Sequence, residues 1–538
     1  MAYPRHPVDP RHPVPVPAVP TSSLRRYRAQ ILDPHRSAST PQRRPNPAAY
    51  VKDQLLVQGS GGGPAIEALL AAAKETGHDI GASTSSRTKR EKYVSQLGKR
   101  AIKDLTARTW VTRMHLQATP GSDAAPDAWS VLQRFREIAG DPSQDGQFGV
   151  GLNHLVTLTA GVGISGVPYI DGPAMHGAAP YIDGPAFGTP YIDGPAFGTP
   201  YIDGPGVGGR LPVTWLGSPP SPPVATTRGR RPVVAVLDTG LGRNEWLTDP
   251  DAVLGATVLG EQIGLGPDVP DAEVTGSVVD PRLGTLDRDA GHGTFIAGIV
   301  RQTCPDARVL AIRVMPSDGV VDEHQLIIAL NKLLVRHAIA QSAKNADDII
   351  DVLSLSLGYY REDPDDVAYT GVLARTLQSF AELGVAVVTA AGNDRTTTPM
   401  FPAGLASRRE GADVPATSVP LVSVGALNPS GTKALFSNDG PWVSAWRPGA
   451  NVVSTLPTTF DGSAQPVVVT QAGAESLDPD DYQGGFGVWS GTSFAAPVLA
   501  GEIAADLVQQ GSLQVLTPAS MVRRGRKAVT NTVGWTLS

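Results

Sequence analysis

The chain has 538 residues, a net charge of −6 and a hydrophobic fraction of 41%. This length exceeds what one hydrophobic core needs, so we expect more than one folded unit. The slightly acidic balance argues against a nucleic-acid-binding protein, because such proteins concentrate positive charge. The single cysteine, Cys304, excludes an intramolecular disulfide. The 59 glycines and 48 prolines exceed average usage and indicate long loops or linkers.

The N-terminal segment MAYPRHPVDPRHPVPVPAVP is interrupted by prolines and lacks the apolar stretch of a signal peptide. No part of the chain approaches the roughly 18 consecutive apolar residues of a transmembrane helix. We therefore expect a cytoplasmic protein without a membrane span, although export by another route stays open. Residues 1–50 are rich in proline and arginine and predict a disordered tail. A docking arm for an acidic partner is the alternative.

Residues 51–160 predict a small α+β domain. Strands are expected at DQLLVQ (53–58), TWVTRMHLQ (109–117) and HLVTLTA (154–160). Helices are expected at PAIEALLAAAKETG (64–77) and PDAWSVLQRFREIAG (126–140), where apolar residues recur at helical spacing before a terminal glycine. Segment 78–108 carries no clear pattern, and we assign it no structure.

Residues 161–230 predict a low-complexity linker. Here PYIDGPAMHGAA is followed by two copies of PYIDGPAFGT and by PYIDGPGVGG, so residues 168–209 form a repeat. Each unit carries Asp-Gly-Pro, which favours a turn, and holds too few apolar residues to build a core. We expect an extended connection, which ends near the basic segment TTRGRR.

Residues 231–538 predict a doubly wound α/β domain with a parallel sheet. The evidence is a series of near-continuous apolar runs that alternate with helical patterns: VVAVLD, RVLAIRVM, DVLSLSLG, VAVVTAAG and VPLVSVGA. Such runs are typical of strands that are buried on both faces of a parallel sheet.

Four polar residues stand at positions where such a fold gathers its functional groups. Asp238 ends VVAVLD and Asn393 ends VAVVTAAGN, each at the carboxyl end of an expected strand. His292 in DAGHGTFIAGIV and Ser493 in WSGTSFAAP each stand at an expected helix start. Each residue alone has an ordinary explanation as a turn, cap or core residue. Together they supply the acid, base, hydrogen-bond donor and hydroxyl that catalysis by a serine nucleophile requires.

The motifs VVAVLDTG, GHGTFIAGIV, LSLSLG, TAAGN and SGTSFAAP, in this order over roughly residues 228–510, resemble the subtilisin-like serine peptidases, or subtilases. The resemblance implies a serine endopeptidase that works through an acyl-enzyme. It implies that Ser493 attacks the scissile carbonyl, that His292 moves the proton and that Asp238 orients His292. Asn393 and the backbone N–H of Ser493 would bind the oxyanion.

The resemblance also implies where a substrate binds. Ser356, Leu357 and Gly358 in LSLSLG resemble the family's segment that pairs with an extended peptide. Ala391 and Gly392 would line the floor of the primary pocket. The implied partners are protein or peptide substrates, and the chemistry requires no cofactor. Structural calcium is compatible with the family, but the sequence offers no identifiable ligands.

Two departures from the commonest family pattern, Phe295 and Phe494, leave the catalytic set complete. Residues 51–160 resemble the family's propeptide in the order of their elements only. Our hypothesis is that this domain inhibits the enzyme and that self-processing in the linker, or at TTRGRR, releases it; a permanent partner-binding domain is the alternative. A catalytically silent scaffold is the alternative for the whole chain, and the presence of all four catalytic groups favours the enzyme.

Overall fold

The computed structural model describes residues 14–34, 45–59, 64–82, 91–122, 125–139, 149–158, 210–221, 230–363, 367–406 and 414–535. The predicted repeat, most of TTRGRR and parts of the predicted tail lie outside these residues.

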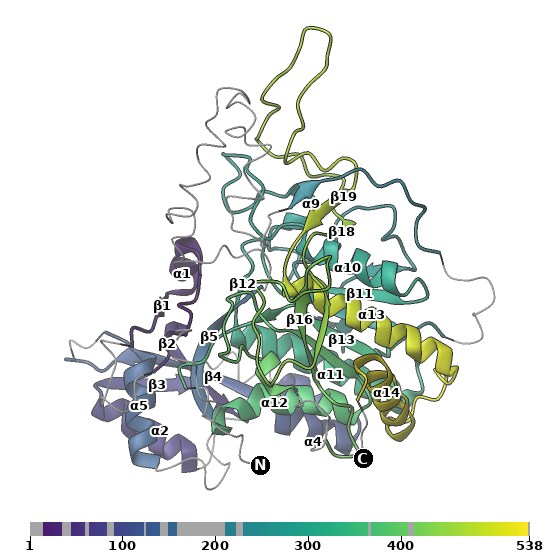
Figure 1. Ribbon diagram of the computed structural model, residues 1–538. Helices are drawn as coiled ribbons and strands as arrows, with labels where there is room; N and C mark the ends of the chain where they lie inside the picture. The colour runs from purple at the N-terminus through teal and green to yellow at the C-terminus, as the bar shows by residue number, and fades with distance from the viewer. Residues whose placement is uncertain are drawn as a thin grey trace.

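The central sheet consists of seven parallel strands in the order β17-β16-β15-β13-β7-β11-β8 (Figure 1). Their bounds are β7 Val233–Asp238, β8 Ala252–Leu254, β11 Arg308–Arg313, β13 Val352–Leu355, β15 Ala386–Ala390, β16 Val422–Leu427 and β17 Ala445–Pro448. Each of the predicted apolar runs contains one of these strands. The predicted doubly wound α/β fold is therefore confirmed.

Helices cover both faces of this sheet. In β7, Val234 and Val236 pack in one core with α10 and α13, whereas Ala235 and Leu237 pack in a second core with α11 and α12. Because both faces are buried, the strand is apolar throughout. The helices of this part are α9 Ala272–Thr275, α10 His292–Thr303, α11 Glu323–Ala343, α12 Val367–Glu382, α13 Thr492–Gln510 and α14 Pro518–Val533.

Small sheets complete this part of the molecule. β9 pairs with β10, and β19 lies between β18 and β6. Strand β6 lies within residues 161–230, which we predicted to be a linker. The C-terminal part of that range is therefore attached to the α/β domain through the pairing of β6 with β19. The bounds are β6 Leu211–Pro212, β9 Thr257–Val258, β10 Glu261–Gln262, β18 Val452–Thr455 and β19 Phe486–Trp489.

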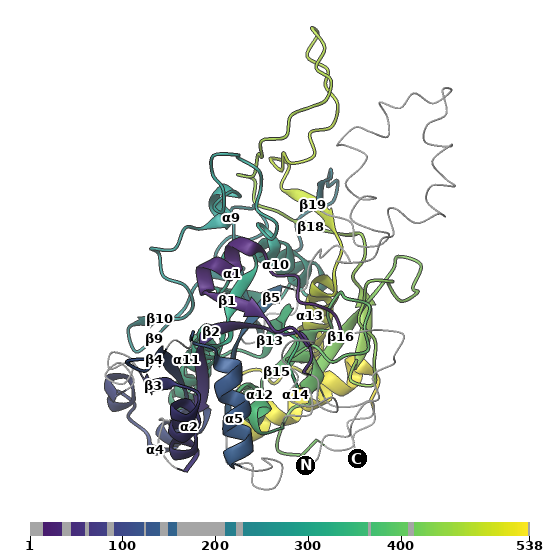
Figure 2. The same cartoon turned by 90° about the vertical axis from the view of Figure 1, so that its left-hand side faces the viewer.

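A second seven-stranded sheet joins two distant parts of the chain (Figures 1 and 2). Its path is β12-β5-β2-β4-β3, with β1 beside β2 and β14 beside β5. Helices α2 and α5 share one core with this sheet, and α4 packs against α11. The bounds are β1 Ala29–Ile31, β2 Ala49–Gln58, β3 His78–Ala82, β4 Val111–Ala118, β5 Val150–Leu158, β12 Val320–Asp322, β14 Leu357–Gly358, α1 Thr21–Tyr27, α2 Pro64–Glu75, α4 Arg100–Thr109 and α5 Ala128–Ala139.

The segment that we left unassigned contains β3 and α4. Ile80 is the one large apolar residue in β3, and Ile102 and Leu105 are the two in α4. So few apolar positions produce no clear periodicity, and burial against the rest of the protein decides the structure instead.

The prediction of a disordered tail is wrong for residues 21–31, which contain α1 and β1, and for residues 49–50, which begin β2. Contacts of the first of these segments show why. Ser23 Oγ donates a hydrogen bond to Asp318 at 2.6 Å. The carbonyl of Val320 accepts hydrogen bonds from Arg26 at 3.1 Å and from the Tyr27 hydroxyl at 3.0 Å. The segment is ordered by partners almost 300 positions away in the chain, which the local composition cannot reveal.

Strand β5 lies between β12 and β14 and is antiparallel to both. Thr157 is opposite Val320 on one side and Gly358 on the other, and Leu158 is opposite Leu357. The N–H of Leu158 donates to the Gly319 carbonyl at 3.0 Å. The last residues of the N-terminal domain therefore add a strand between two edges of the α/β domain.

An ion cluster accompanies this strand. His154 of β5 is fully buried, with Nδ1 2.8 Å from Glu323 Oε2 and Nε2 2.7 Å from Glu362 Oε2. Since carboxylates accept hydrogen bonds, both ring nitrogens donate, as in the charged imidazolium. Burial alone would lower the pKa of His154, but the attraction of Glu362 and the hydrogen bonds to both carboxylates outweigh it and raise the pKa to about 9.

We expect docking of β5 to weaken as the pH rises. An undocked His154 has the usual pKa of 6.5, so the proton stabilises docking fully below that pH and loses its effect as the pH passes about 9. The difference between the two pKa values corresponds to roughly 3 kcal/mol of docking free energy. Hydrogen-exchange protection of the β5 amides, corrected for intrinsic exchange, measures it between about pH 6 and pH 10. A His154→Gln variant should lack this dependence; pH-independent protection in the unaltered protein would contradict the prediction.

Candidate active site

Asp238 and His292 form a buried acid–base pair. Asp238 is the last residue of β7, and His292 is the first residue of α10. His292 Nδ1 donates to Asp238 Oδ1 at 2.7 Å, and the N–H of Thr239 donates to the same oxygen at 2.8 Å. Burial alone would lower the pKa of His292, but the charge and the hydrogen bond of Asp238 raise it. The contact fixes the imidazole with one proton on Nδ1, so Nε2 is the nitrogen that can exchange a proton.

Ser493 is the second residue of α13 and is fully buried. Its Oγ donates to the Ser356 carbonyl at 3.3 Å, and Ser356 Oγ donates to the Ser493 carbonyl at 2.8 Å. Among the residues that the structure describes, His292 Nε2 has no hydrogen-bond partner, so the link from Ser493 Oγ to the base is not formed in this conformation. The N–H of Ser493 lies in the first turn, where a helix does not use its backbone N–H groups.

Aromatic rings enclose the imidazole. The centroids of Trp489 and Phe494 lie 5.7 and 5.4 Å from that of His292. Phe295 packs on Phe494 at 4.6 Å and on Trp489 at 5.8 Å. The two residues that depart from the common family pattern therefore belong to one apolar cluster, which keeps the surroundings of the base dry and strengthens its electrostatic contacts.

Asn393 is held by the start of α13. Its Oδ1 accepts hydrogen bonds from the N–H and the hydroxyl of Thr492, both at 2.9 Å, and the Thr492 hydroxyl accepts one from Gly392 N–H at 3.0 Å. These contacts identify the oxygen of the Asn393 side chain, so its NH₂ group points away from Thr492. The helix that we expected to start at Ser493 begins one residue earlier, at Thr492.

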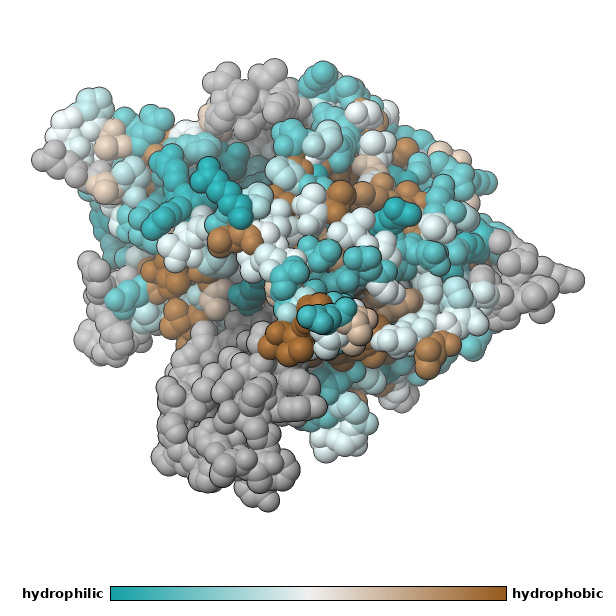
Figure 3. Space-filling model, turned by 90° about the horizontal axis from the view of Figure 1, so that it is seen from above, coloured by the Kyte–Doolittle hydropathy of each residue, from teal (hydrophilic) through white to brown (hydrophobic). Residues whose placement is uncertain are grey.

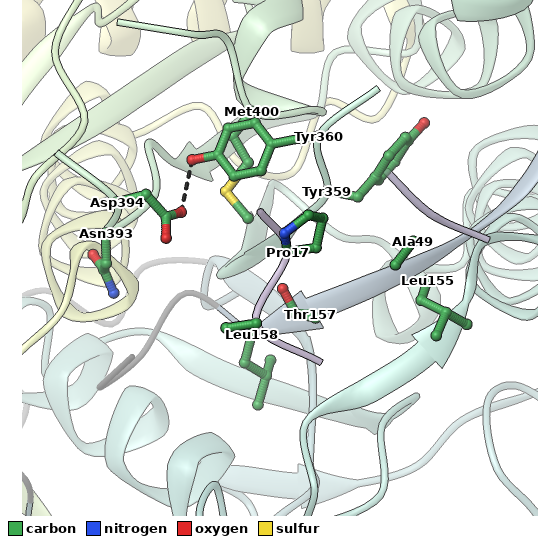
Figure 4. A pocket seen from close by; sticks show the side chains of 11 residues that line it. Pro17, Ala49, Leu155, Thr157, Leu158, Tyr359, Tyr360, Asn393, Asp394 and Met400 are labelled. Carbon is green, nitrogen blue, oxygen red and sulfur yellow. Dashed lines mark hydrogen bonds between the residues drawn. The ribbon is translucent and has the colours of Figure 1, made fainter. Parts of the chain in front are cut away.

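The predicted substrate-pairing residues are covered by β5. Leu357 and Gly358 form β14 and pair with that strand, and Ser356 precedes them. Ala391 and Gly392 are buried but do not line the pocket at this edge. Figure 4 shows that pocket, where the Tyr360 hydroxyl donates to Asp394 at 2.7 Å. Its lining combines both parts of the chain: Pro17, Ala18, Ala49, Leu155, Thr157, Leu158, Tyr359, Tyr360, Asn393, Asp394 and Met400.

Glu273 is a residue that the sequence did not reveal. It lies in α9, is fully buried, and accepts hydrogen bonds from the hydroxyls of Thr239 and Thr294 and from Gly291 N–H at 3.0 Å. Burial raises the pKa of Glu273 to about 7, although the threonine hydrogen bonds oppose this. The Thr239 hydroxyl also lies 3.2 Å from Asp238 Oδ1, so Glu273 supports the Asp238–His292 pair through Thr239. Glu273 lies in a helix of only four residues, which is too short to give a recognisable sequence pattern.

The described residues contain no group of three or more His, Cys, Asp or Glu side chains that could hold a metal ion. Calcium binding thus stays a prediction. Within the described part of the chain, no helix is both long and apolar enough to cross a membrane. Seen from above, the surface is largely hydrophilic, with hydrophobic side chains in small separate groups (Figure 3). Scattered groups of this kind are normal for a protein surface.

The chain is similar to several known proteins. The model of the subtilase family matches residues 229–533. Subtilisin-like protease 2 of Pseudogymnoascus destructans is 27% identical over 295 residues, which cover 53% of this chain and 58% of that protein. Mycosin-3 of Mycobacterium tuberculosis is 27% identical over 305 residues, which cover 51% of this chain and 58% of that protein.

The chain thus spans somewhat more than half the length of the curated relatives it matches. Among solved structures, fervidolysin from Fervidobacterium pennivorans, a keratinolytic enzyme related to subtilisin, has 16% identity and a TM-score of 0.42. That likeness covers 86% of this chain and 55% of the other. Because the family model matches more than half of its residues, the chain belongs to the subtilase family.

Proposed function

We propose that this chain is a serine endopeptidase that hydrolyses peptide bonds through Asp238, His292 and Ser493. The observation that carries the proposal is the buried contact of 2.7 Å between His292 Nδ1 and Asp238 Oδ1. The carboxylate fixes the tautomer and favours the imidazolium that forms during the reaction. The helix with Ser493 starts beside this pair, since Phe494 contacts the ring of His292.

The same groups define the steps. Ser493 Oγ attacks the carbonyl carbon of the substrate while His292 Nε2 accepts the hydroxyl proton. The resulting oxyanion receives hydrogen bonds from Ser493 N–H and from the NH₂ of Asn393, whose orientation Thr492 supports. His292 then protonates the leaving amine, and water cleaves the acyl-enzyme in the same way.

We also propose that the N-terminal domain is an intramolecular inhibitor that the enzyme removes by self-processing. Strand β5 occupies the edge that a substrate would need, with Leu158 opposite Leu357 and Thr157 opposite Gly358. Leu158 and Asn393 line one pocket (Figure 4), so β5 ends beside the residue assigned to the oxyanion. This favours a cut shortly after Leu158 over a cut at TTRGRR.

Replacing the nucleophile tests both proposals. The purified unaltered chain should contain fragments that begin shortly after Leu158, whereas Ser493→Ala should stay intact, because the hydroxyl makes the cut. N-terminal sequencing and mass spectrometry identify the fragments. Identical fragments in both proteins would contradict self-processing. A fluorophosphonate probe should label the processed chain at Ser493 and leave Ser493→Ala unlabelled; absence of label in the processed chain would contradict the peptidase.

An Asp238→Asn variant should lose activity and shift its pH profile. The expected loss of kcat is about 10⁴-fold, the magnitude known for this change in a serine peptidase triad. Asp238 raises the pKa of His292, and the base must be neutral, so removal of the charge should move the acidic limb to lower pH. Measuring kcat/KM against pH tests this. An acidic limb at an unchanged pH would show that Asp238 does not set the pKa of the base.

A Glu273→Gln variant should act through the catalytic pair and not through substrate binding. Glutamine cannot accept all the hydrogen bonds that the Glu273 carboxyl group accepts. Loss of one such hydrogen bond should lower kcat about tenfold and change KM little. Since Glu273 itself has a pKa of about 7 and is largely neutral in the acidic limb, that limb should stay close to its position in the unaltered enzyme. Glu475→Gln, at an exposed position, is the matched control. Unchanged kcat in Glu273→Gln would exclude the positioning role.

A further inference from the structure

Glu323, Tyr359 and Glu362, which hold the imidazole of His154, belong to the α/β domain, whereas Arg136, which donates to Glu362, belongs to the N-terminal domain. Glu323 directly follows β12, and Tyr359 and Glu362 follow β14, so the site borders both strands that hold β5. The Tyr359 ring stacks on the imidazole with centroids 4.7 Å apart and an interplanar angle of 22°. The Tyr359 hydroxyl donates to Glu323 Oε1 at 2.6 Å. Glu323, Tyr359 and Glu362, which we call the recess, thus place two carboxylates and one aromatic ring around one cation.

The charges of this recess change when the N-terminal domain leaves. His154 and Arg136, which donates to Glu362 at 3.1 Å, both belong to that domain and leave with it. Of the three positive groups that lower the pKa of Glu362, Arg361 is then the one that stays. Loss of the other two leaves the carboxylates less compensated, so a cation that returns to the recess is favoured.

Backbone register determines which substrate residue can supply that cation. A peptide that replaces β5 pairs with Gly358 through the residue in the place of Thr157. His154 lies three positions before Thr157. If the substrate keeps the direction and pairing of β5, its residue three positions before the one opposite Gly358 enters the recess.

We propose that Glu323 and Glu362 form a substrate subsite that selects a basic side chain three residues before the substrate residue opposite Gly358. The subsite rests on the proposed peptidase function, and His154 is the intramolecular occupant that shows how it is filled. Lysine, arginine and protonated histidine are its ligands. A recess that serves only to anchor the N-terminal domain would show no such preference in cleaved peptides.

A lysine scan tests the subsite with the full chain after self-processing. A single lysine is moved through an otherwise uncharged peptide, and the cut is mapped by mass spectrometry. One position, at a fixed distance before the cut, should raise kcat/KM about tenfold or more over alanine, as expected for a buried charge pair, and glutamate there should give no gain. A scan without a maximum would overturn the proposal.

Variants identify the residues responsible. In the double variant Glu323→Gln, Glu362→Gln, the ratio of kcat/KM between the lysine and alanine peptides should fall to near one, because neutral amides do not favour a cation. Glu475→Gln should keep the ratio of the unaltered enzyme. A maximum that survives in the double variant would overturn the assignment. Fluorophosphonate labelling of the same samples separates the two proposals: a labelled enzyme with a flat scan contradicts the subsite alone.

A second measurement needs no peptidase activity. In the full chain with Ser493→Ala, His154→Lys keeps a cation in the recess, whereas His154→Gln is neutral. Hydrogen-exchange protection of β5 at neutral pH should be about tenfold or more greater for the lysine variant than for the glutamine variant. Equal protection in the two variants would show that the recess does not select a cation. Equal protection would therefore overturn the proposed cation preference even if the fluorophosphonate probe does not label Ser493.

Discussion

The addition of β5 between β12 and β14 is the interaction on which the arrangement of the two parts of the protein depends. β12 has three residues and β14 has two, and within the described chain β5 is their sheet partner. Such short edges gain their hydrogen bonds only from an extended segment, and any extended segment of suitable sequence can supply them. The edge therefore favours an extended backbone in its occupant, and β5 pairs with it in the antiparallel direction.

The Asp238–His292 pair depends on groups that surround it. Glu273 supports the loop around Asp238, the aromatic cluster encloses His292, and Thr492 orients Asn393. These supports come from separate parts of the chain and are buried, so few of them can move independently. A site of this kind stabilises developing charge with little reorganisation, which is the main advantage that a folded active site has over water.

The sequence predicted those features whose cause is local. The apolar run that ends at Asp238 is a buried strand, and His292 does begin a helix, because these signals lie within a few residues of each other. The sequence could not predict α4, Glu273 or the surroundings of His154. Their causes are contacts between distant segments: His154 and Glu362, for instance, are separated by 208 positions. Pairings over such distances leave no trace in periodicity or composition.

Both ends of the long segment between the domains are attached. β5 ends at Leu158 on the N-terminal sheet, and β6, which begins at Leu211, pairs with β19. While that segment is continuous, the two domains meet as parts of one molecule, at an effective concentration that the covalent connection sets. This concentration does not change when the protein is diluted. If the self-processing that we propose cuts the connection, reassociation becomes a bimolecular event, and the fraction of molecules with β5 undocked depends on how dilute the protein is.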